Sequence, residues 1–172
     1  MLLGSAEVSI DAKQRMAIPA KHRQQLNAEV NGSSLVCVPS VRGGDEVSAG
    51  GSGGSGVAGA GGVGVLKLYP MKKFAELCAA YEESATADAD VETWEAAFYG
   101  RAEEIEMDGA GRLTLPKALL EKVGLVGEEL VIVGAGNRLE LRAKRGWEAT
   151  LAKTEPRMGD LNRRIEGRRR GV

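Results

Sequence analysis

The chain has 172 residues, of which 43% are hydrophobic, 27% are charged and only 4% are aromatic. This length suits one compact unit or two small ones that share a core, and the scarcity of aromatic side chains predicts a mostly aliphatic core. The formal net charge of −1 excludes a global attraction to nucleic acid or to anionic membranes. Binding to a polyanion would therefore need positive charge that is concentrated locally or repeated by oligomerisation.

Targeting and membrane-spanning segments are not expected. The apolar start, Met1–Leu3, is too short for a signal peptide, and no stretch approaches the roughly 20 apolar residues of a membrane span. Cys37 and Cys78 lack metal-ligand spacing, which favours buried free thiols in a reducing compartment over a disulfide. We therefore expect a cytoplasmic protein without a membrane partner.

The chain contains one pattern twice, at residues 7–19 and at residues 104–116. In each copy, alternating apolar residues lead to an aspartate, an arginine follows four positions later, and a proline follows four positions after the arginine. The matching residues are Asp11 and Asp108, Arg15 and Arg112, and Pro19 and Pro116, all at an offset of 97 (108 − 11). A constant offset over this length indicates an internal duplication.

The first copy predicts a strand, a turn, a second strand, a short helix and a third strand. These elements are expected at residues 5–10, 11–14, 16–18, 20–28 and 35–38. Alternation places Val8 and Ile10 on one face of the first strand, and the Asp11 side chain can cap the turn. Pro19 has a backbone angle that suits the first turn of the helix.

A glycine-rich segment, residues 43–64, interrupts the first copy with eleven glycines in 22 positions. Such a composition buries too little apolar surface to offset the entropy of ordering, so we expect a flexible loop. The offset between the copies falls from 95 (130 − 35) to 73 (139 − 66) across this segment. The difference indicates an insertion in a hairpin loop and not a linker between domains.

The remaining elements continue the first copy and then repeat its plan. We expect a strand at residues 65–68, helices at 71–83 and 90–100, and a hairpin at 104–115. A helix at 117–123, which Gly124 terminates, is then followed by strands at 130–133 and 139–141 and by a closing helix around Trp147. Beyond Pro156, an arginine-rich tail admits two interpretations, a disordered end or a sequence-independent contact with phosphates.

These elements predict an α+β fold, mainly β with short helices. One copy alone is too small to bury a core, so the two internal repeats are expected to interleave their hairpins in one barrel with pseudo-twofold symmetry. The expected boundaries are 5–72 for the first repeat, 73–101 for connecting helices, 102–145 for the second repeat, and 146–172 for a C-terminal helix and a basic tail.

Catalysis is not expected. The one histidine, His22, stands between Lys21 and Arg23 on the predicted short helix, where a surface position is expected. The sequence shows no cluster of metal ligands at suitable spacing and no plausible pair of nucleophile and base. We therefore expect no catalytic residue, no metal, no cofactor and no small-molecule substrate.

Charge distinguishes the two copies. Four basic residues accompany one aspartate between residues 11 and 25, namely Lys13, Arg15, Lys21 and Arg23. The second copy has three glutamates just upstream of its turn, at positions 103, 104 and 106. Basic side chains around a turn can bind phosphates, and arginine can read guanine edges, so the first copy is the predicted DNA-binding surface. The alternative, which we favour for the second copy, is that the aspartate–arginine pair only pins its turn.

The two motifs together resemble the AbrB-like DNA-binding family, and their tandem arrangement in one chain is similar to the MraZ family. The likeness covers nearly all of the chain except residues 43–64 and the tail. The residues that carry it are Asp11–Arg15 with Ile18, Pro19 and Arg23, Asp108–Leu113 with Leu115 and Pro116, and Tyr69, Pro70 and Gly100.

The resemblance implies a swapped-hairpin barrel that assembles into a ring-like homo-oligomer. It also implies a sequence-specific transcriptional regulator at the nucleoid, which binds double-stranded DNA at short direct repeats upstream of the division and cell-wall gene cluster. When the DNA-contacting positions of the family are transferred to this sequence, Arg15 is the main DNA contact, and Lys13 and Arg23 are supporting contacts. Lys21 is added to this set because of its charge. The turns themselves would be maintained by Asp11, Pro19, Asp108, Gly111, Arg112 and Pro116.

One departure from the family pattern concerns the first turn, where Gln14 stands at the position that Gly111 occupies in the second. A positive φ at this position would cost a glutamine about 1–2 kcal/mol, so we expect a differently shaped first turn and an altered DNA preference. Two alternative functions are an oligomeric adaptor for protein partners and an AbrB-type antitoxin.

Overall fold

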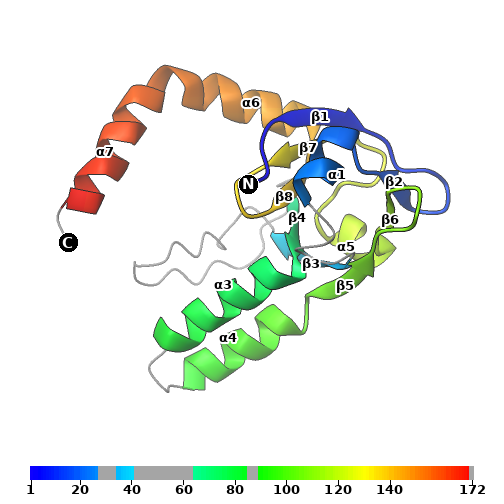
Figure 1. Cartoon of the computed structure of the whole chain (residues 1–172), viewed down its shortest axis with the longest axis horizontal. Helices are drawn as coiled ribbons and strands as arrows, with labels where there is room; N and C mark the ends of the chain where they lie inside the picture. Colours follow the sequence, from blue (N-terminus) through cyan, green and yellow to red (C-terminus); the bar gives the residue numbers. More distant parts are fainter. Residues whose placement is uncertain (27–33, 41–63, 85–88, 171–172) are drawn as a thin grey trace.

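The computed structural model describes residues 1–26, 34–40, 64–84 and 89–170, in which helices surround an antiparallel sheet (Figure 1). The strands are β1 (Ser5–Val8), β2 (Arg15–Ala17), β3 (Ser34–Ser40), β4 (Val65–Pro70), β5 (Glu103–Glu106), β6 (Arg112–Thr114), β7 (Leu130–Gly134) and β8 (Leu139–Ala143). The helices are α1 (Ala20–Leu26), α3 (Met71–Ser84), α4 (Ala89–Tyr99), α5 (Lys117–Lys122), α6 (Lys144–Thr154), the 3-10 helix η1 (Glu155–Arg157) and α7 (Met158–Arg170). The predicted α+β class is confirmed.

Strand pairing interleaves the two copies of the repeat. Six strands form an antiparallel sheet in the order β1-β7-β8-β4-β3-β5, and β2 and β6 form a separate two-stranded ribbon. Strand β1 of the first copy pairs with β7 of the second, while β5 of the second copy pairs with β3 of the first. Each copy therefore supplies an edge strand to the other.

The register of these strands has the pseudo-twofold symmetry expected of a duplication. Val8 pairs with Leu130 at one edge of the sheet, and Ile105 pairs with Leu35 at the other. The two pairs correspond residue by residue, at offsets of 97 (105 − 8) and 95 (130 − 35). The offsets found in the sequence are therefore the same as those in the sheet.

The two-stranded ribbon lies on the pseudo-twofold axis. Met16 pairs with Leu113, which is its own equivalent in the second copy (113 − 16 = 97). Isolated bridges from Ile10 to Met16 and from Met107 to Leu113 connect the ribbon to the segments that follow β1 and β5. The six-stranded sheet itself is open, with β1 and β5 at its edges, so closure into a swapped-hairpin barrel stays a prediction.

Aliphatic side chains from both copies make one core against the sheet, as the composition predicts. Its fully buried members include Met16, Leu66, Leu113, Ile132 and Leu141. Cys37 also lies in this core, and burial raises the pKa of its thiol. Both cysteines are free thiols as expected, but Cys78 is only half-buried because it lies on the peripheral helix α3.

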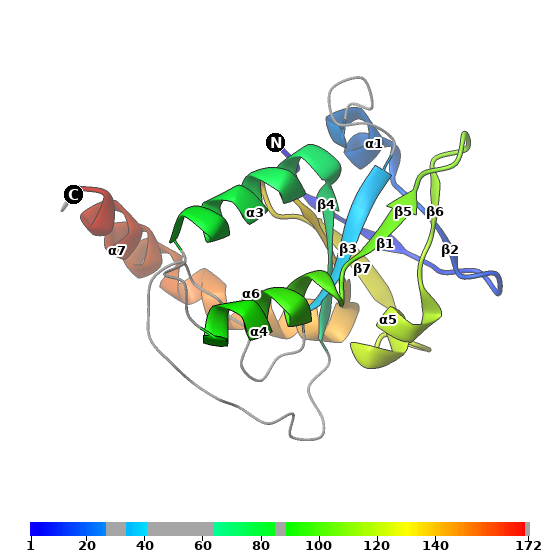
Figure 2. The same ribbon diagram turned by 90° about the horizontal axis from the view of Figure 1, so that it is seen from below.

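A helical hairpin of α3 and α4 covers the opposite face of the sheet (Figure 2). Residues of β3 alternate between the two faces: Leu35 joins the aliphatic core, while Val36 contacts the helical hairpin. Aromatic rings pack between the two helices, with 5.9 Å between the ring centroids of Phe74 and Phe98. These aromatic residues therefore belong to a second hydrophobic cluster.

Helix boundaries and the tail can be compared with the sequence expectations. Helix α1 begins at Ala20 as predicted and is described to Leu26, whereas residues 27–28 and residues 43–63 of the glycine-rich segment lie outside the described residues. Gly124 follows α5 with φ +68, the left-handed conformation typical of a helix terminator. The tail, for which a disordered end is one interpretation, is helical in α7 and extends away from the sheet (Figure 1).

Candidate nucleic-acid interface

The first turn is built around the carboxylate of Asp11. Its Oδ1 accepts hydrogen bonds from the backbone N–H groups of Lys13 at 2.8 Å and Arg15 at 2.9 Å. Its Oδ2 accepts a hydrogen bond from Nε of Arg15 at 2.8 Å and lies 2.7 Å from Nη2 of the same guanidinium. The backbone N–H of Gln14 donates to the Asp11 carbonyl at 2.9 Å. One carboxylate thus fixes both the turn and the direction of the Arg15 side chain.

The second turn repeats this geometry. Oδ1 of Asp108 accepts hydrogen bonds from the backbone N–H groups of Ala110 and Arg112, each at 2.9 Å. Its Oδ2 accepts a hydrogen bond from Nε of Arg112 at 2.8 Å, and the N–H of Gly111 donates to the Asp108 carbonyl at 2.8 Å. The two turns therefore share one hydrogen-bond pattern.

Gln14 adopts the same left-handed backbone conformation as its glycine equivalent. The φ angle is +60 at Gln14 and +76 at Gly111, and Gln14 is the only non-glycine residue with positive φ in the described part of the chain. The expectation of a differently shaped first turn is therefore wrong. The hydrogen bonds around Asp11 hold the turn against a strain of about 1–2 kcal/mol.

Both turn carboxylates are ionised at neutral pH. The side-chain hydrogen bond from Arg15, together with backbone N–H groups, lowers the pKa of Asp11 from 3.8 to about 2. The pKa of Asp108 is also below its usual value, chiefly because the backbone N–H of Arg112 donates to its carboxylate. Each aspartate–arginine pair is therefore an ion pair at physiological pH.

The ribbon presents both of these arginines on its solvent-facing side. Met16 and Leu113 point into the core, and successive strand residues point to opposite faces. The outward face is therefore made of Arg15, Ala17, Arg112 and Thr114. Arg15 pairs with Thr114, two residues from Arg112, so the two arginines are diagonal neighbours about 7–8 Å apart. Their side chains are 34% and 41% exposed.

Both turns and the ribbon lie at the end of the molecule farthest from α7 (Figures 1 and 2). The four predicted DNA contacts do not all gather there around one turn. Lys13 is exposed on the first turn, whereas Lys21 donates to the carbonyl of Ser5 in β1. Arg23 crosses to the other copy, where its Nη1 donates to the Ala110 carbonyl at 3.1 Å. The basic patch expected from the sequence is therefore divided.

His22 is not at the surface, contrary to expectation. Its side chain is fully buried, Nε2 lies 3.3 Å from the Gly4 carbonyl oxygen, and Nδ1 has no hydrogen-bond partner among the described residues. Burial lowers the pKa of His22 below 6.5, against a smaller opposing effect of the Gly4 carbonyl. The equivalent residue in the second copy, Leu119, is also buried, so this helix position packs against the core in both copies.

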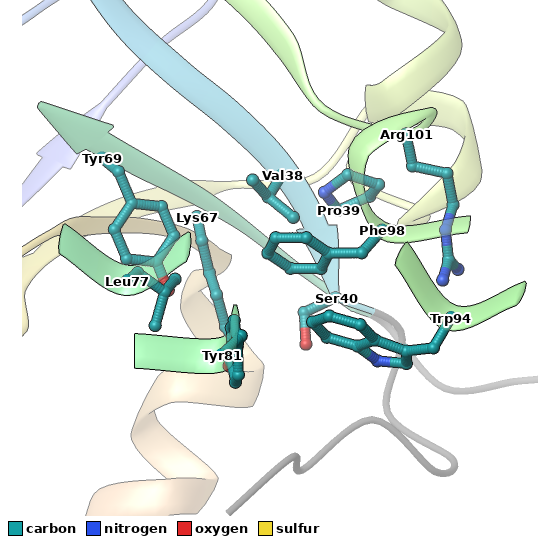
Figure 3. A pocket seen from close by; sticks show the side chains of 10 residues that line it. All are labelled: Val38, Pro39, Ser40, Lys67, Tyr69, Leu77, Tyr81, Trp94, Phe98 and Arg101. Atoms are coloured by element: carbon teal, nitrogen blue, oxygen red, sulfur yellow. The ribbon is translucent and has the colours of Figure 1, made fainter. Parts of the chain in front are cut away.

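The cavity beneath the helical hairpin is too small for a typical small-molecule site. The cavity beneath α3 and α4 has a volume of about 100 Å³, whereas small-molecule sites usually have about 300–1,000 Å³. Figure 3 shows Tyr81, Trp94 and Phe98 around this cavity, where the last two rings stack 4.9 Å apart. Within the described ranges, no group of His, Cys, Asp and Glu could hold a metal, and no helix is long and apolar enough to cross a membrane.

Two features of the interface are missed by sequence reasoning. The sequence does contain a signal for the outward placement of Arg112, because the alternation of apolar and polar residues around Leu113 matches that around Met16. The crossing of Arg23 to the second turn had none, because it joins residues 87 positions apart (110 − 23). The candidate interface therefore contains residues of both copies and not of the first alone.

Comparisons with known proteins give the family of the chain. The model of a family described as "MraZ protein, putative antitoxin-like" matches residues 1–41 and 98–167, which carry both turns. A relative named "Transcriptional regulator MraZ" from Variovorax paradoxus (strain S110) is 30% identical over 165 residues, which cover 94% of this chain and 96% of the relative. The relative of the same name from Nitrosomonas europaea is 26% identical, with 97% and 98% covered.

A third relative of this name, from Methylobacillus flagellatus, is 28% identical over 151 residues, which cover 88% of this chain and 86% of the relative. The names describe regulators and not enzymes, in agreement with the expectation that the chain is not an enzyme. The family model matches more than half of the chain, and the alignments with the relatives span most of the chain. The chain therefore belongs to the MraZ family.

Proposed function

We propose that the chain is a sequence-specific DNA-binding transcriptional regulator and that the ribbon of β2 and β6 is its DNA-binding surface. The observation that carries the proposal is the outward pair of Arg15 and Arg112, one from each copy, each oriented by an aspartate. The names of the relatives support a role in the regulation of transcription.

The chemistry of the ribbon suits the major groove of DNA. A two-stranded β-ribbon fits this groove, and arginine is the side chain that most often reads guanine there. A guanidinium has five N–H donors, so the ion pair of Arg15 with Asp11 does not exhaust its capacity to donate. Lys13, exposed on the first turn, would bind a phosphate and thereby position the ribbon. The contribution of Lys21 stays a prediction.

Oligomerisation would explain how a chain with a net charge of −1 binds a polyanion. A ring-like homo-oligomer would present one ribbon per subunit, and successive ribbons would engage successive short direct repeats. Linked weak contacts of this kind raise the avidity without any new contact. The family resemblance supports the further proposal that these repeats lie upstream of the division and cell-wall gene cluster and that the protein acts at the nucleoid in the cytoplasm.

Titration of the 172-residue chain against labelled DNA from upstream of its own gene tests this function. We expect a salt-sensitive complex whose affinity exceeds that for a shuffled sequence by at least about tenfold, because base contacts add to the phosphate term. Equal affinity for shuffled DNA would contradict sequence-specific binding. Mass measurement in solution tests the ring, and a strict monomer at micromolar concentration would exclude it.

A second candidate function is that of an AbrB-type antitoxin, which the description of the family as antitoxin-like favours. Such a protein would bind a toxin in addition to DNA. A toxin-like gene beside that of the chain, whose product copurifies with it, would support this function. A methyltransferase or division gene downstream, without such a partner, would support the regulator.

A further inference from the structure

We infer that Arg23 is a positioning residue, supplied by the first copy, that locks the second turn in the conformation that presents Arg112. The inference rests on the proposed DNA binding, because the position of Arg112 matters to function only if the ribbon contacts DNA. It assigns Arg23 a role different from the direct DNA contact expected from the sequence.

Two hydrogen bonds from the first copy hold the second turn. Nη1 of Arg23 donates to the carbonyl of Ala110 at 3.1 Å. The backbone N–H of Ile18, just before α1, donates to the carbonyl of Gly111 at 2.9 Å. The charged donor therefore acts at the tip of the turn, one residue from the carbonyl that the backbone holds.

Gly111 is the residue that allows this contact. A Cβ atom at this position would collide with Nη1 and Cδ of Arg23, so a larger residue would displace the arginine side chain from the turn. The arginine therefore lies directly against the backbone of the turn. Glycine adopts the φ of +76 without strain, and its missing side chain leaves room for the close approach of Arg23 from the other copy.

The first turn has no counterpart of the Arg23–Ala110 hydrogen bond, which we call the lock, but it does have the backbone hydrogen bond from the other copy. The N–H of Leu115 donates to the Gln14 carbonyl at 2.8 Å, the direct counterpart of the bond from Ile18. The equivalent of Arg23 is Leu120 (120 − 23 = 97), which is buried and lines one groove with Gln14. Each turn thus has a matched pair: arginine with glycine at the second, and leucine with glutamine at the first.

The lock has a consequence for Arg112. Asp108 orients the arginine, and the backbone N–H groups of Ala110 and Arg112 hold Asp108. A turn released at Ala110 would therefore let the carboxylate and its arginine leave the outward face together. On this proposal Arg23 acts through the Ala110 carbonyl, so its removal should weaken DNA binding while the phosphates of the complex stay neutralised.

Salt dependence separates this role from a direct contact. We expect Arg23→Met to weaken binding of the upstream DNA roughly tenfold, the factor for one hydrogen bond from a charged donor, with the slope of log affinity against log salt unchanged. Lys13→Ala should make that slope shallower by about 0.9 for each phosphate that the lysine neutralises.

Two further variants are controls for this comparison. Arg23→Lys keeps a donor and should restore most of the affinity, whereas Gln24→Ala, at an exposed neighbouring residue, should leave the affinity unchanged. A slope as shallow for Arg23→Met as for Lys13→Ala would overturn the inference.

A double-mutant cycle on thermal unfolding, without DNA, tests the lock by itself. We expect Gly111→Ala to lower Tm by less in the Arg23→Ala background than in the wild-type chain, because the collision is then absent. Equal decreases in the two backgrounds would overturn the lock. If the cycle shows coupling but the wild-type chain does not bind DNA, the proposed function fails and the lock stands as a structural contact only.

Discussion

The two turns of this chain have the same hydrogen bonds but stand in different surroundings. The first, residues 11–15, carries the exposed Lys13 and a glutamine with positive φ. The second, residues 108–112, has Ala110 in place of the lysine, follows a strand with three exposed glutamates, and receives Arg23 from the first copy. A duplicated motif can thus keep its shape while its charge and packing diverge, because the aspartate makes the bonds of the turn.

The largest expected difference between the turns concerns their arginines. Arg15→Ala should weaken binding of the upstream DNA about 30- to 100-fold, equivalent to about 2–3 kcal/mol. Arg112→Ala should weaken DNA binding only about tenfold, because the glutamates of β5 reduce the attraction of the second turn for phosphates. Fluorescence anisotropy with labelled DNA measures both affinities.

Thermal unfolding of both arginine variants is the control for this comparison, because each substitution also removes an ion pair from its turn. Equal decreases in affinity would show that the ribbon binds symmetrically. A greater decrease for Arg112→Ala would reverse the assignment of the stronger contact.

The left-handed position tests how much the packing of the two turns differs. Gly111→Gln should lower the free energy of unfolding by about 1–3 kcal/mol, because it adds backbone strain and displaces Arg23 from its hydrogen bond with Ala110. Gln14→Gly should raise it by up to about 1 kcal/mol, since relief of strain is partly offset by the greater freedom of the unfolded chain. Urea denaturation measures both, and changes of equal size would contradict the role of Arg23.

A charge exchange between the turns should have a smaller effect. Lys13→Ala should weaken DNA binding about three- to fivefold, and Ala110→Lys, its counterpart in the second turn, should strengthen binding by a similar factor, since each changes one phosphate contact. Titrations at several salt concentrations measure both variants. An unchanged affinity for Ala110→Lys would indicate that the second turn does not approach the phosphates.

The smallest expected effect distinguishes His22 from its equivalent, Leu119. Burial lowers the pKa of His22 from 6.5, so below this pH the unfolded chain binds a proton that the folded chain does not. Stability attributable to this residue is therefore present above the unfolded pKa and decreases as the pH falls toward the folded pKa. His22→Leu should remove this decrease, as measured by urea denaturation at about pH 7.5 and about pH 5. Parallel pH profiles for the two proteins would contradict it.

Much of the fold follows from periodicity in the sequence. The offsets of 97 and 95 found in the sequence also relate the strand pairs of the sheet, because a duplication keeps both the apolar pattern and the turn residues. The sequence likewise predicts the strand around Met16, from its alternating apolar residues, and the start of α1 after Pro19. Each of these features depends on residues that are close in sequence.

Other features could not be predicted from the sequence because they depend on tertiary contacts. The burial of His22 requires the N-terminal residues around Gly4 to cover α1, and nothing in the helix sequence indicates this cover. The division of the basic patch arises because the Arg23 side chain of α1 reaches the second turn and not the first. Charges that are neighbours along the chain can thus lie at different ends of a ribbon.

By itself, the sequence determined the duplication, the α+β class and the two aspartate turns, because local spacing specifies strands, turns and helix starts. Only the tertiary structure decided that Gln14 shares the left-handed conformation of Gly111, that Arg15 and Arg112 lie on one outward face, and that Arg23 belongs to the second turn. The physical reason is the interleaving of the copies. It adds hydrogen bonds and packing from the other copy, far away in the sequence, to the local bonds that each aspartate makes.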